Sequence, residues 1–345
     1  MKKKLLAVVI GATAAMPLMA TADVSIYGRV HMSLDHLDNG NDYKEVNVSS
    51  NSSRLGFRGN RAVGDITAFF QIEQQIDFNE GTSSFAGRDT FAGLRGDFGS
   101  IRLGQFDTPF KQARGPANLF GDQVGDMRNL TRVGDARFDE RTPNTFHYQT
   151  PNFSGFAGNI AYSVHEGKTA ADGQDGDAIS LSLTYKAGPL DTALAYEKFE
   201  EDTGRGERDG VRFAIGYNVT SDLKLVGFYQ TVDYDGRTVE QIARKDDWSA
   251  DTWGLGADFK VAPQTYIRGM WMQRDADASD SQSDMWAFGV EHRLDSALRV
   301  YANYAWVKND DNVALTPWSQ ARTATPNGSA GDNAKGLSAG MRYDF

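Results

Sequence analysis

The sequence of 345 residues contains no cysteine, only 9 prolines, and no apolar run of about 20 residues beyond its first 20 positions. The lack of cysteine excludes a disulfide scaffold, a thiolate nucleophile and a cysteine-ligated metal. The lack of long apolar runs excludes a polytopic helical membrane protein, because every helical span needs such a run. Basic tracts are also missing and the pI is about 5.0, which argues against binding to nucleic acid.

The first 22 residues have the form of a secretory signal peptide. Three lysines at positions 2–4 precede an apolar stretch, and this stretch ends in the small residues Ala20, Thr21 and Ala22. We expect cleavage after Ala22. An exported single domain of residues 23–345 follows, and the loss of three lysines makes its formal net charge more negative than the −10 of the full sequence.

The mature chain alternates apolar and polar residues with a period of two, in stretches of about ten residues. In the first stretch Val24, Ile26, Val30 and Leu34 fall on one face, and polar residues occupy most of the other. We predict sixteen strands, at 24–36, 46–59, 64–78, 88–96, 99–107, 143–150, 156–166, 177–187, 191–200, 209–218, 222–233, 250–260, 264–274, 284–293, 297–308 and 336–345.

The connections between these strands alternate between short turns, such as 97–98 and 188–190, and longer loops, such as 167–176 and 309–335. An even number of antiparallel strands with this alternation predicts an all-β fold, a 16-stranded antiparallel transmembrane β-barrel. Lipid requires every backbone group to be paired, so the sheet must close. The alternative is a soluble β-sandwich or propeller, but aromatic residues near the strand ends favour the barrel because they form interfacial girdles.

Several segments, in this order and at these spacings, resemble the general trimeric porins of Gram-negative outer membranes. They are residues 23–29 (DVSIYGR), 53–59 (SRLGFRG), 88–96 (RDTFAGLRG), 99–104 (GSIRLG) and 340–345 (GMRYDF). The resemblance covers the mature chain. It implies a homotrimer in outer-membrane lipid and lipopolysaccharide, a third loop folded into the lumen, and a terminal Phe345 that is read by the barrel assembly machinery.

Strand parity predicts which arginines face the lumen. Leu55 and Phe57 face lipid, so Arg54 and Arg58 face inward. An arginine that faced lipid at the midplane would cost roughly 2–4 kcal/mol. Parity also places three further arginines on the inner face, namely Arg29, Arg102 and Arg141.

Arg88 faces inward if Phe91 faces lipid, which would complete a basic wall on one side of the lumen. By resemblance Arg54, Arg88 and Arg141 match the family's basic wall at the pore constriction, and the other three inward arginines are second candidates. Arginine suits this position because it keeps its charge beside other cations. The alternative is that these residues are solvated and have no special role.

The connection 108–142 is far longer than a hairpin needs, and we predict that it is the constriction loop. Asp122 and Asp126 lie within it, and the resemblance places acidic residues of this loop opposite the arginines. Such an arrangement would create a transverse field across a narrow aqueous pore. Alternatively, both are ordinary loop charges paired with Arg114, Arg128 or Arg132.

The sequence predicts no enzyme, no cofactor and no metal centre. Its five histidines show no metal-ligand spacing, and no nucleophile-elbow or phosphate-loop motif is present. Aspartates near 172–177 and 275–284 indicate solvated outer loops, or alternatively bridges through divalent cations to lipopolysaccharide. The predicted function is passive diffusion of small hydrophilic solutes and ions through the outer membrane. A substrate-selective channel and a structural or adhesive barrel are the alternatives.

Overall fold

The computed structural model describes residues 23–164, 177–200, 204–320, 322 and 326–345. The expected signal peptide, the loop predicted at 167–176 and the last two residues of the strand predicted at 156–166 lie outside the described residues. Among the helices that the structure describes, none is long and apolar enough to span a membrane.

The described residues form one antiparallel sheet of eighteen strand elements, with five short helices in its connections. The strands are β1 (Asp23–Asp38), β2 (Lys44–Ser50), β3 (Arg54–Val63), β4 (Ile66–Asp77), β5 (Thr82–Ser84), β6 (Thr90–Gly96), β7 (Gly99–Asp107), β8 (Arg141–Gln149), β9 (Phe156–Ser163), β10 (Ala178–Ala187), β11 (Leu190–Phe199), β12 (Glu207–Asn218), β13 (Leu223–Gly236), β14 (Ala250–Ala262), β15 (Thr265–Ala276), β16 (Ser283–Arg293), β17 (Leu298–Asn309) and β18 (Ala334–Asp344). The helices are α2 (Pro109–Gln112), the 3-10 helix η1 (Gly115–Ala117), α3 (Arg128–Thr131), α4 (Val239–Ile242) and α5 (Lys245–Trp248).

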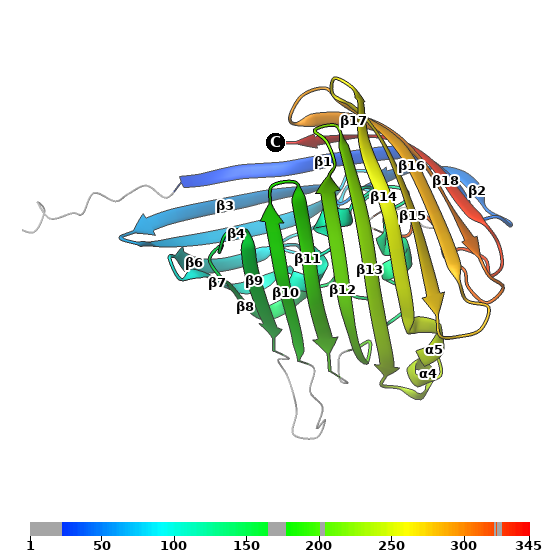
Figure 1. The fold of residues 1–345 in the computed structure, drawn as a ribbon, viewed down its shortest axis with the longest axis horizontal. Helices are drawn as coiled ribbons and strands as arrows, with labels where there is room; N and C mark the ends of the chain where they lie inside the picture. Colours follow the sequence, from blue (N-terminus) through cyan, green and yellow to red (C-terminus); the bar gives the residue numbers. More distant parts are fainter. Residues whose placement is uncertain (1–22, 165–176, 201–203, 321, 323–325) are drawn as a thin grey trace, which may run out of the picture.

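The sheet closes into a ring because its first and last strands pair. β1 pairs with β18 over ten residues, from Arg29 opposite Asp344 to Asp38 opposite Lys335. The other edge of β1 pairs with β2 and β3, which are two parts of one strand, and β5 and β6 both pair with β4 in the same way. The described residues therefore form a closed barrel of sixteen strands, as the sequence predicts, and Figure 1 shows its wall.

The outer face of the barrel exposes the apolar side chains of the alternating pattern. In β1, Ile26 is 63% exposed and Leu34 is 56% exposed, whereas His31 and Asp35 on the other face are buried. A β-sandwich would bury such apolar residues between two sheets. An exposed apolar outer face and a polar inner face are what a transmembrane barrel requires.

Two breaks in the strands depart from the predicted boundaries. Residues 51–53 separate β2 from β3, and Ser52 adopts a positive φ of 57° there. Residues 51–53 lie opposite only two residues of β1, between the pairs Arg29–Arg54 and Met32–Ser50. One extra residue on one of two paired strands is the geometry of a β-bulge. A longer break at 85–89 separates β5 from β6. The strand predicted at 46–59 is therefore interrupted, the strand predicted at 88–96 begins only at Thr90, and β5 lies in the gap between the predicted strands 64–78 and 88–96.

One further boundary is wrong in detail, and one condition of the sequence analysis is not met. Residues 60–63, which separate the predicted strands 46–59 and 64–78, continue β3, and the turn is confined to 64–65. The inward position of Arg88 was conditional on Phe91 facing lipid, but Phe91 pairs directly with the inward residue Gln71 and therefore faces the lumen. Arg88 precedes β6 and lies in the break at 85–89, so its position does not follow from the parity of that strand.

Short turns lie at one end of the barrel and long connections at the other. The end with the turns 64–65, 97–98 and 188–189 is called the short-turn end below. The longest described connection, 108–140, joins β7 to β8 and contains α2, η1 and α3.

The connection 108–140 contacts inward residues on many strands. Lys224 of β13 donates to the Pro116 carbonyl at 2.9 Å, and Arg268 of β15 donates to the Leu119 carbonyl at 3.1 Å. Asn303 of β17 donates to the Gln123 side chain. These strands lie at different positions around the ring, and each contributes an inner-face residue to the contacts with the connection.

A buried ion pair fixes this connection to the wall. Asp139 accepts from Arg212 of β12 at 2.6 Å, and neither side chain is exposed. Arg114 lies 3.3 Å from the same carboxylate oxygen. Arg212 also donates to the Phe110 carbonyl and to Gln230 of β13. The two ends of the connection are thus attached to one arginine of the barrel.

Candidate functional site

The connection 108–140 and the strands around it enclose a cavity of about 450 Å³ in the lumen. Twelve of its lining residues are lysine or arginine and four are aspartate or glutamate, an excess of eight positive charges. The basic residues are Arg29, Arg54, Arg88, Lys111, Arg114, Arg128, Arg141, Lys224, Arg268, Arg293, Arg299 and Arg342, and the acidic residues are Asp107, Asp122, Asp258 and Glu291.

Arg54 and Arg88 share one carboxylate. Arg88 Nε lies 2.5 Å from Oε1 of Glu73, an inward residue of β4, and Arg54 Nε lies 3.6 Å from Oε2. The Tyr27 hydroxyl donates to the same Oε2 at 3.0 Å. Glu73 therefore holds two guanidinium groups in place while it neutralises the charge of only one.

Arg141 and Lys111 meet at a second carboxylate group beside the connection. Arg141 Nε lies 2.7 Å from Asp89 and 2.9 Å from Asp107, and Lys111 Nζ lies 2.8 Å from Asp107. Burial lowers the pKa of Lys111 to about 8, because the loss of hydration and the guanidinium groups of Arg141 and Arg114 outweigh the attraction of Asp107. This lysine is therefore charged at neutral pH and titrates just above it.

The far side of the cavity is also basic. Arg268 Nη2 lies 3.2 Å from Glu291 and 3.7 Å from Asp258, and Arg293 Nε lies 2.9 Å from Glu291. The cationic lining thus continues across β15 and β16. The cavity therefore has lining cations beyond those of the predicted basic wall.

A third shared carboxylate lies where the barrel closes. Asp344 of β18 accepts from Arg29 at 2.7 Å and from Arg342 at 2.8 Å, and Arg299 lies 3.3 Å away. Arg29 Nη1 also lies 3.8 Å from Asp122 of the connection. The first, seventeenth and eighteenth strand elements therefore each contribute an arginine to one cluster.

The two predicted loop acids have different surroundings. Arg128 of α3 binds both of them, with Nη2 at 2.7 Å from Asp122 and 2.5 Å from Asp126. Asp126 is fully buried, accepts from the backbone of Asp122 and of Arg128, and is not among the residues that line the cavity. Asp122 lines the cavity. Its burial would raise its pKa, but Arg128 outweighs this and holds the pKa well below its ordinary value.

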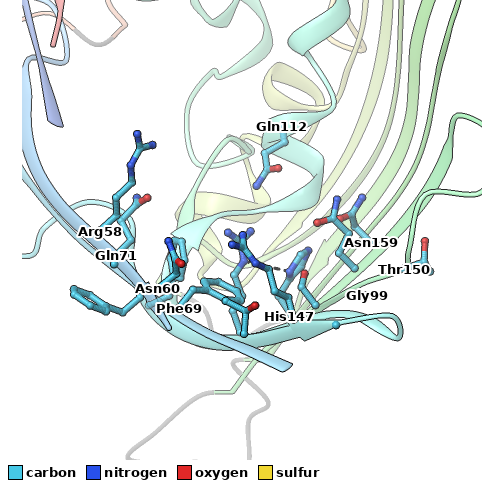
Figure 2. Close-up of a pocket in the computed structure, with 18 of the residues that line it drawn as sticks. Arg58, Asn60, Phe69, Gln71, Gly99, Gln112, His147, Thr150 and Asn159 are labelled. Carbon is cyan, nitrogen blue, oxygen red and sulfur yellow. Dashed lines mark hydrogen bonds between the residues drawn. The ribbon is translucent and has the colours of Figure 1, made fainter. Parts of the chain in front are cut away.

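Four of the six predicted arginines, Arg29, Arg54, Arg88 and Arg141, line this cavity together with Asp122. The other two line a second cavity of about 730 Å³ nearer the short-turn end. There Arg58 Nε donates to Ser25, and Arg102 Nε donates to Nδ1 of His147. Figure 2 shows Arg58 and Gln71 on one side of this cavity, His147 and Asn159 on the other, and Gln112 above them.

The sequence analysis missed eight of the twelve lining cations. Parity would have identified four of them, because each lies between outward residues in its strand, namely Lys224, Arg268, Arg299 and Arg342. The connection 108–140 has no strand periodicity, so no comparable signal marks the cations that it contributes, namely Lys111, Arg114 and Arg128.

Phe345 lies beside β1 at the closing seam. Its backbone N–H donates to the Gly28 carbonyl at 3.0 Å, and the Gly28 N–H donates to the Phe345 carbonyl at 2.9 Å. Its ring lies 5.6 Å from that of Tyr343, and the side chain is half exposed. Over the part of the chain that the structure describes, no group of three or more His, Cys, Asp or Glu side chains is placed to hold a metal ion.

Comparison with known proteins gives consistent similarities. A family model described as Gram-negative porin matches residues 6–312. Outer membrane porin protein 32 of Delftia acidovorans is 29% identical, and the alignment covers 100% of both chains. The solved structure of an anion-selective porin from Comamonas acidovorans is 26% identical, with a TM-score of 0.79 over 94% of this chain and 100% of that one. In vitro folded OmpT of Vibrio cholerae, in its trimer form, has the same fold, with 18% identity and a TM-score of 0.68 over 94% of this chain and 100% of that one.

Proposed function

This chain belongs to the Gram-negative porin family, and from this premise we propose that its pore prefers anions. The protein is an outer-membrane porin, and it forms a water-filled channel for passive diffusion of small hydrophilic solutes and ions. The family and its named members indicate a channel rather than an enzyme.

The observation that carries the proposal is the excess of eight positive charges among the side chains that line the 450 Å³ cavity. It is larger than the number of carboxylates that pair with these cations from outside the lining, namely Glu73, Asp89, Asp126, Asp139 and Asp344. An aqueous path with low-dielectric walls concentrates the field of its lining, so local charge determines ion preference more than net charge does. The acidic composition of the whole chain therefore does not oppose an anion-preferring pore. Arginine supplies most of these charges, and its guanidinium stays protonated even beside other cations.

Three carboxylates of the lumen support the proposal because each is shared between two or more cations. Glu73 serves Arg54 and Arg88, Glu291 serves Arg268 and Arg293, and Asp344 serves three arginines. A carboxylate that contacts two cations orients both but cancels one charge. This arrangement keeps the guanidinium groups rigid in water while a positive potential remains.

We assign the constriction to Arg54, Arg88, Arg141 and Arg29 on the wall, with Asp122 as the acid of the connection that faces them. Their joint lining of the cavity supports this assignment. Asp126 has another role in the proposal, since its contacts with Arg128 and with the backbone of Asp122 support a positioning function. Arg58 and Arg102 belong to the wider vestibule at the short-turn end.

The proposal extends to assembly. A homotrimer is supported by the trimer form of the Vibrio cholerae structure, and an anion preference by the printed description of the Comamonas acidovorans porin. Contacts with lipopolysaccharide and recognition of Phe345 by the barrel assembly machinery are further parts of the proposal. The half-exposed Phe345 ring at the closing seam supports the second of these.

Reversal potentials of the purified protein in planar bilayers test the proposal. In a KCl gradient we expect a reversal potential of the sign set by chloride, with large ohmic currents. A potential of the sign set by potassium would overturn the anion preference. Saturable block by one solute class would favour a substrate-selective channel, and the absence of conductance would leave a structural or adhesive barrel.

A further inference from the structure

The 730 Å³ cavity at the short-turn end differs chemically from the constriction. It lies between Gln112 of α2 and the inner faces of β3, β4, β6, β7, β8 and β9. Three arginines and one acidic residue, Asp65, line it, and the rest of the lining is uncharged. Large apolar side chains also reach it, whereas Leu119 is the sole large apolar residue in the lining of the constriction cavity.

The arginines of this vestibule are not neutralised. Among the described residues, no carboxylate lies within ion-pair distance of Arg58, Arg95 or Arg102. Arg58 and Arg95 are exposed to the lumen. This contrasts with the constriction, where Glu73, Asp107 and Asp89 already contact the wall cations. A solute anion therefore meets available guanidinium groups in the vestibule.

Aromatic rings line the same wall. Phe69 and Phe91 pack edge to face at 6.1 Å, and Phe91 packs edge to face against the buried Phe106 at 5.8 Å. Inward-facing phenylalanines are exceptional in a polar lumen. Gly93 makes room for one of them, because a Cβ at this position would lie 2.7 Å from Cζ of Phe69.

Two of the guanidinium groups that lack a carboxylate partner stack on these rings. Arg95 lies over Phe69 at 5.6 Å, and Arg102 lies over Phe91 at 4.8 Å and over Phe106 at 4.1 Å. A guanidinium that covers one ring with one face leaves its other face free to stack on a second planar group. The wall therefore offers charge and an apolar planar surface in the same place.

Amide side chains complete the lining. Asn60, Gln71 and Asn159 line the cavity, and Figure 2 shows Gln71 beside Arg58 and Asn159 on the opposite side. Each provides N–H donors without adding charge. A carboxylate that binds to an arginine here would find neutral donors beside it.

We propose that this vestibule binds small carboxylates that carry an aromatic ring, before or after they cross the constriction. The carboxylate contacts Arg58 or Arg95, and the ring packs against the guanidinium planes and the edges of Phe69 and Phe91. Aliphatic carboxylates of similar charge lack the second contact. The proposal rests on the anion-preferring pore and adds a solute class to it.

Block of chloride current tests the site, with benzoate as the probe. We expect benzoate to reduce the conductance of the trimer in a saturable manner, while acetate and the uncharged benzyl alcohol at the same concentration do not. The Phe91→Leu variant keeps an apolar residue but removes the ring, and Arg95→Gln removes one charge. Each should raise the half-blocking concentration of benzoate by about two- to fivefold, the range expected for an exposed cation–π contact.

Arg61→Gln is the matched control, since Arg61 lies on the outer face of β3, close to the turn 64–65 at the short-turn end. It should leave benzoate block unchanged. Equal block by acetate and benzoate, or block unaffected by both lumen variants, would overturn the proposal. If Phe91→Leu does not fold, benzoate block of Arg95→Gln, compared with that of the control Arg61→Gln, still tests the proposal. The KCl reversal potential of each protein separates this result from a failure of the anion preference itself.

Discussion

Arg88 and Glu73 form a buried ion pair, with Arg88 Nε 2.5 Å from Glu73 Oε1. Glu73 is an inward residue of β4, and Arg88 lies in the break between β5 and β6. The break frees Arg88 from the alternation of the strand, so its side chain reaches the carboxylate and the cavity together. An irregularity of the sheet thus places a charge that a continuous strand would have placed elsewhere.

Replacing Glu73 with Gln should make the pore more selective for anions. The change removes one negative charge between Arg54 and Arg88 and keeps the shape of the side chain. A unit charge at 4 Å contributes about 1 kcal/mol in water, so we expect up to a fivefold rise in the chloride-to-potassium permeability ratio. The reversal potential in a KCl gradient measures this permeability ratio. Glu240→Gln, on the exposed surface of α4, should leave the ratio unchanged.

The double substitution Arg54→Ala with Arg88→Ala should shift the preference toward cations. Two positive charges leave the lining of the 450 Å³ cavity, and Glu73 remains without its guanidinium partners. We expect the permeability ratio to fall by about fivefold or more. Arg244→Ala with Arg237→Ala, outside the lumen lining described above, serves as the matched control for lost charge. Reversal potentials identical to those of the wild type would remove these residues from the constriction.

The anion preference should weaken as the pH rises through about 8. Burial lowers the pKa of Lys111 to about 8, so this lysine is cationic below that pH and neutral above it. Reversal potentials measured from pH 6 to 9 should show a step centred near pH 8. The Lys111→Arg variant keeps its charge over this range and should lose the step. A step that persists in this variant would show that another group is responsible.

Asp139→Asn should loosen the connection 108–140 and destabilise the barrel. The substitution leaves the buried Arg212 without its carboxylate partner, a loss of about 3–5 kcal/mol in the free energy of unfolding. Thermal unfolding in detergent measures it, with the exposed Asp311→Asn as the control. Larger fluctuations of the single-channel current should accompany the loss, because Asp122 of the same connection belongs to the proposed constriction.

The ion pair of Asp139 with Arg212 also makes the stability of the barrel depend on pH. Burial raises the pKa of Asp139, but Arg212 and Arg114 outweigh it and hold the pKa well below its ordinary value. A depressed carboxyl pKa gives stability that is complete above the unfolded pKa, about 4, and is lost as the pH falls through the folded pKa. The difference in stability between the wild type and Asp139→Asn should therefore shrink in strong acid. A constant difference down to pH 2 would contradict this account.

The strands were predictable because the lipid face and the aqueous lumen impose a period of two. Most of the connections among the described residues follow, within a few residues, from where that pattern stops. The exact positions of the breaks were not predictable, although residues 51–53 are Asn-Ser-Ser and the break at 85–89 contains Gly87 and overlaps the gap between the predicted strands 64–78 and 88–96. Their position depends on pairing with β1 and β4, which sequence patterns do not report.

The site was predictable in part for a related reason. Parity identifies inward charges one strand at a time, so it found Arg54 and Arg29. It does not indicate that Glu73 contacts two arginines or that Asp344 contacts three, because these contacts join strands far apart in the sequence. The partner of the loop acids is local, and Arg128 was one of the three candidates that the sequence offered for it.

The seam between β1 and β18 has a consequence for how the molecule forms. Arg29 pairs with Asp344, 315 positions away, both along the backbone and through their side chains. No local hairpin can substitute for this contact, so the sheet keeps two open edges until its terminal strands meet. We therefore expect sealing to be a late step in folding of the barrel, and the arginine cluster at the seam is complete only when the terminal strands have paired.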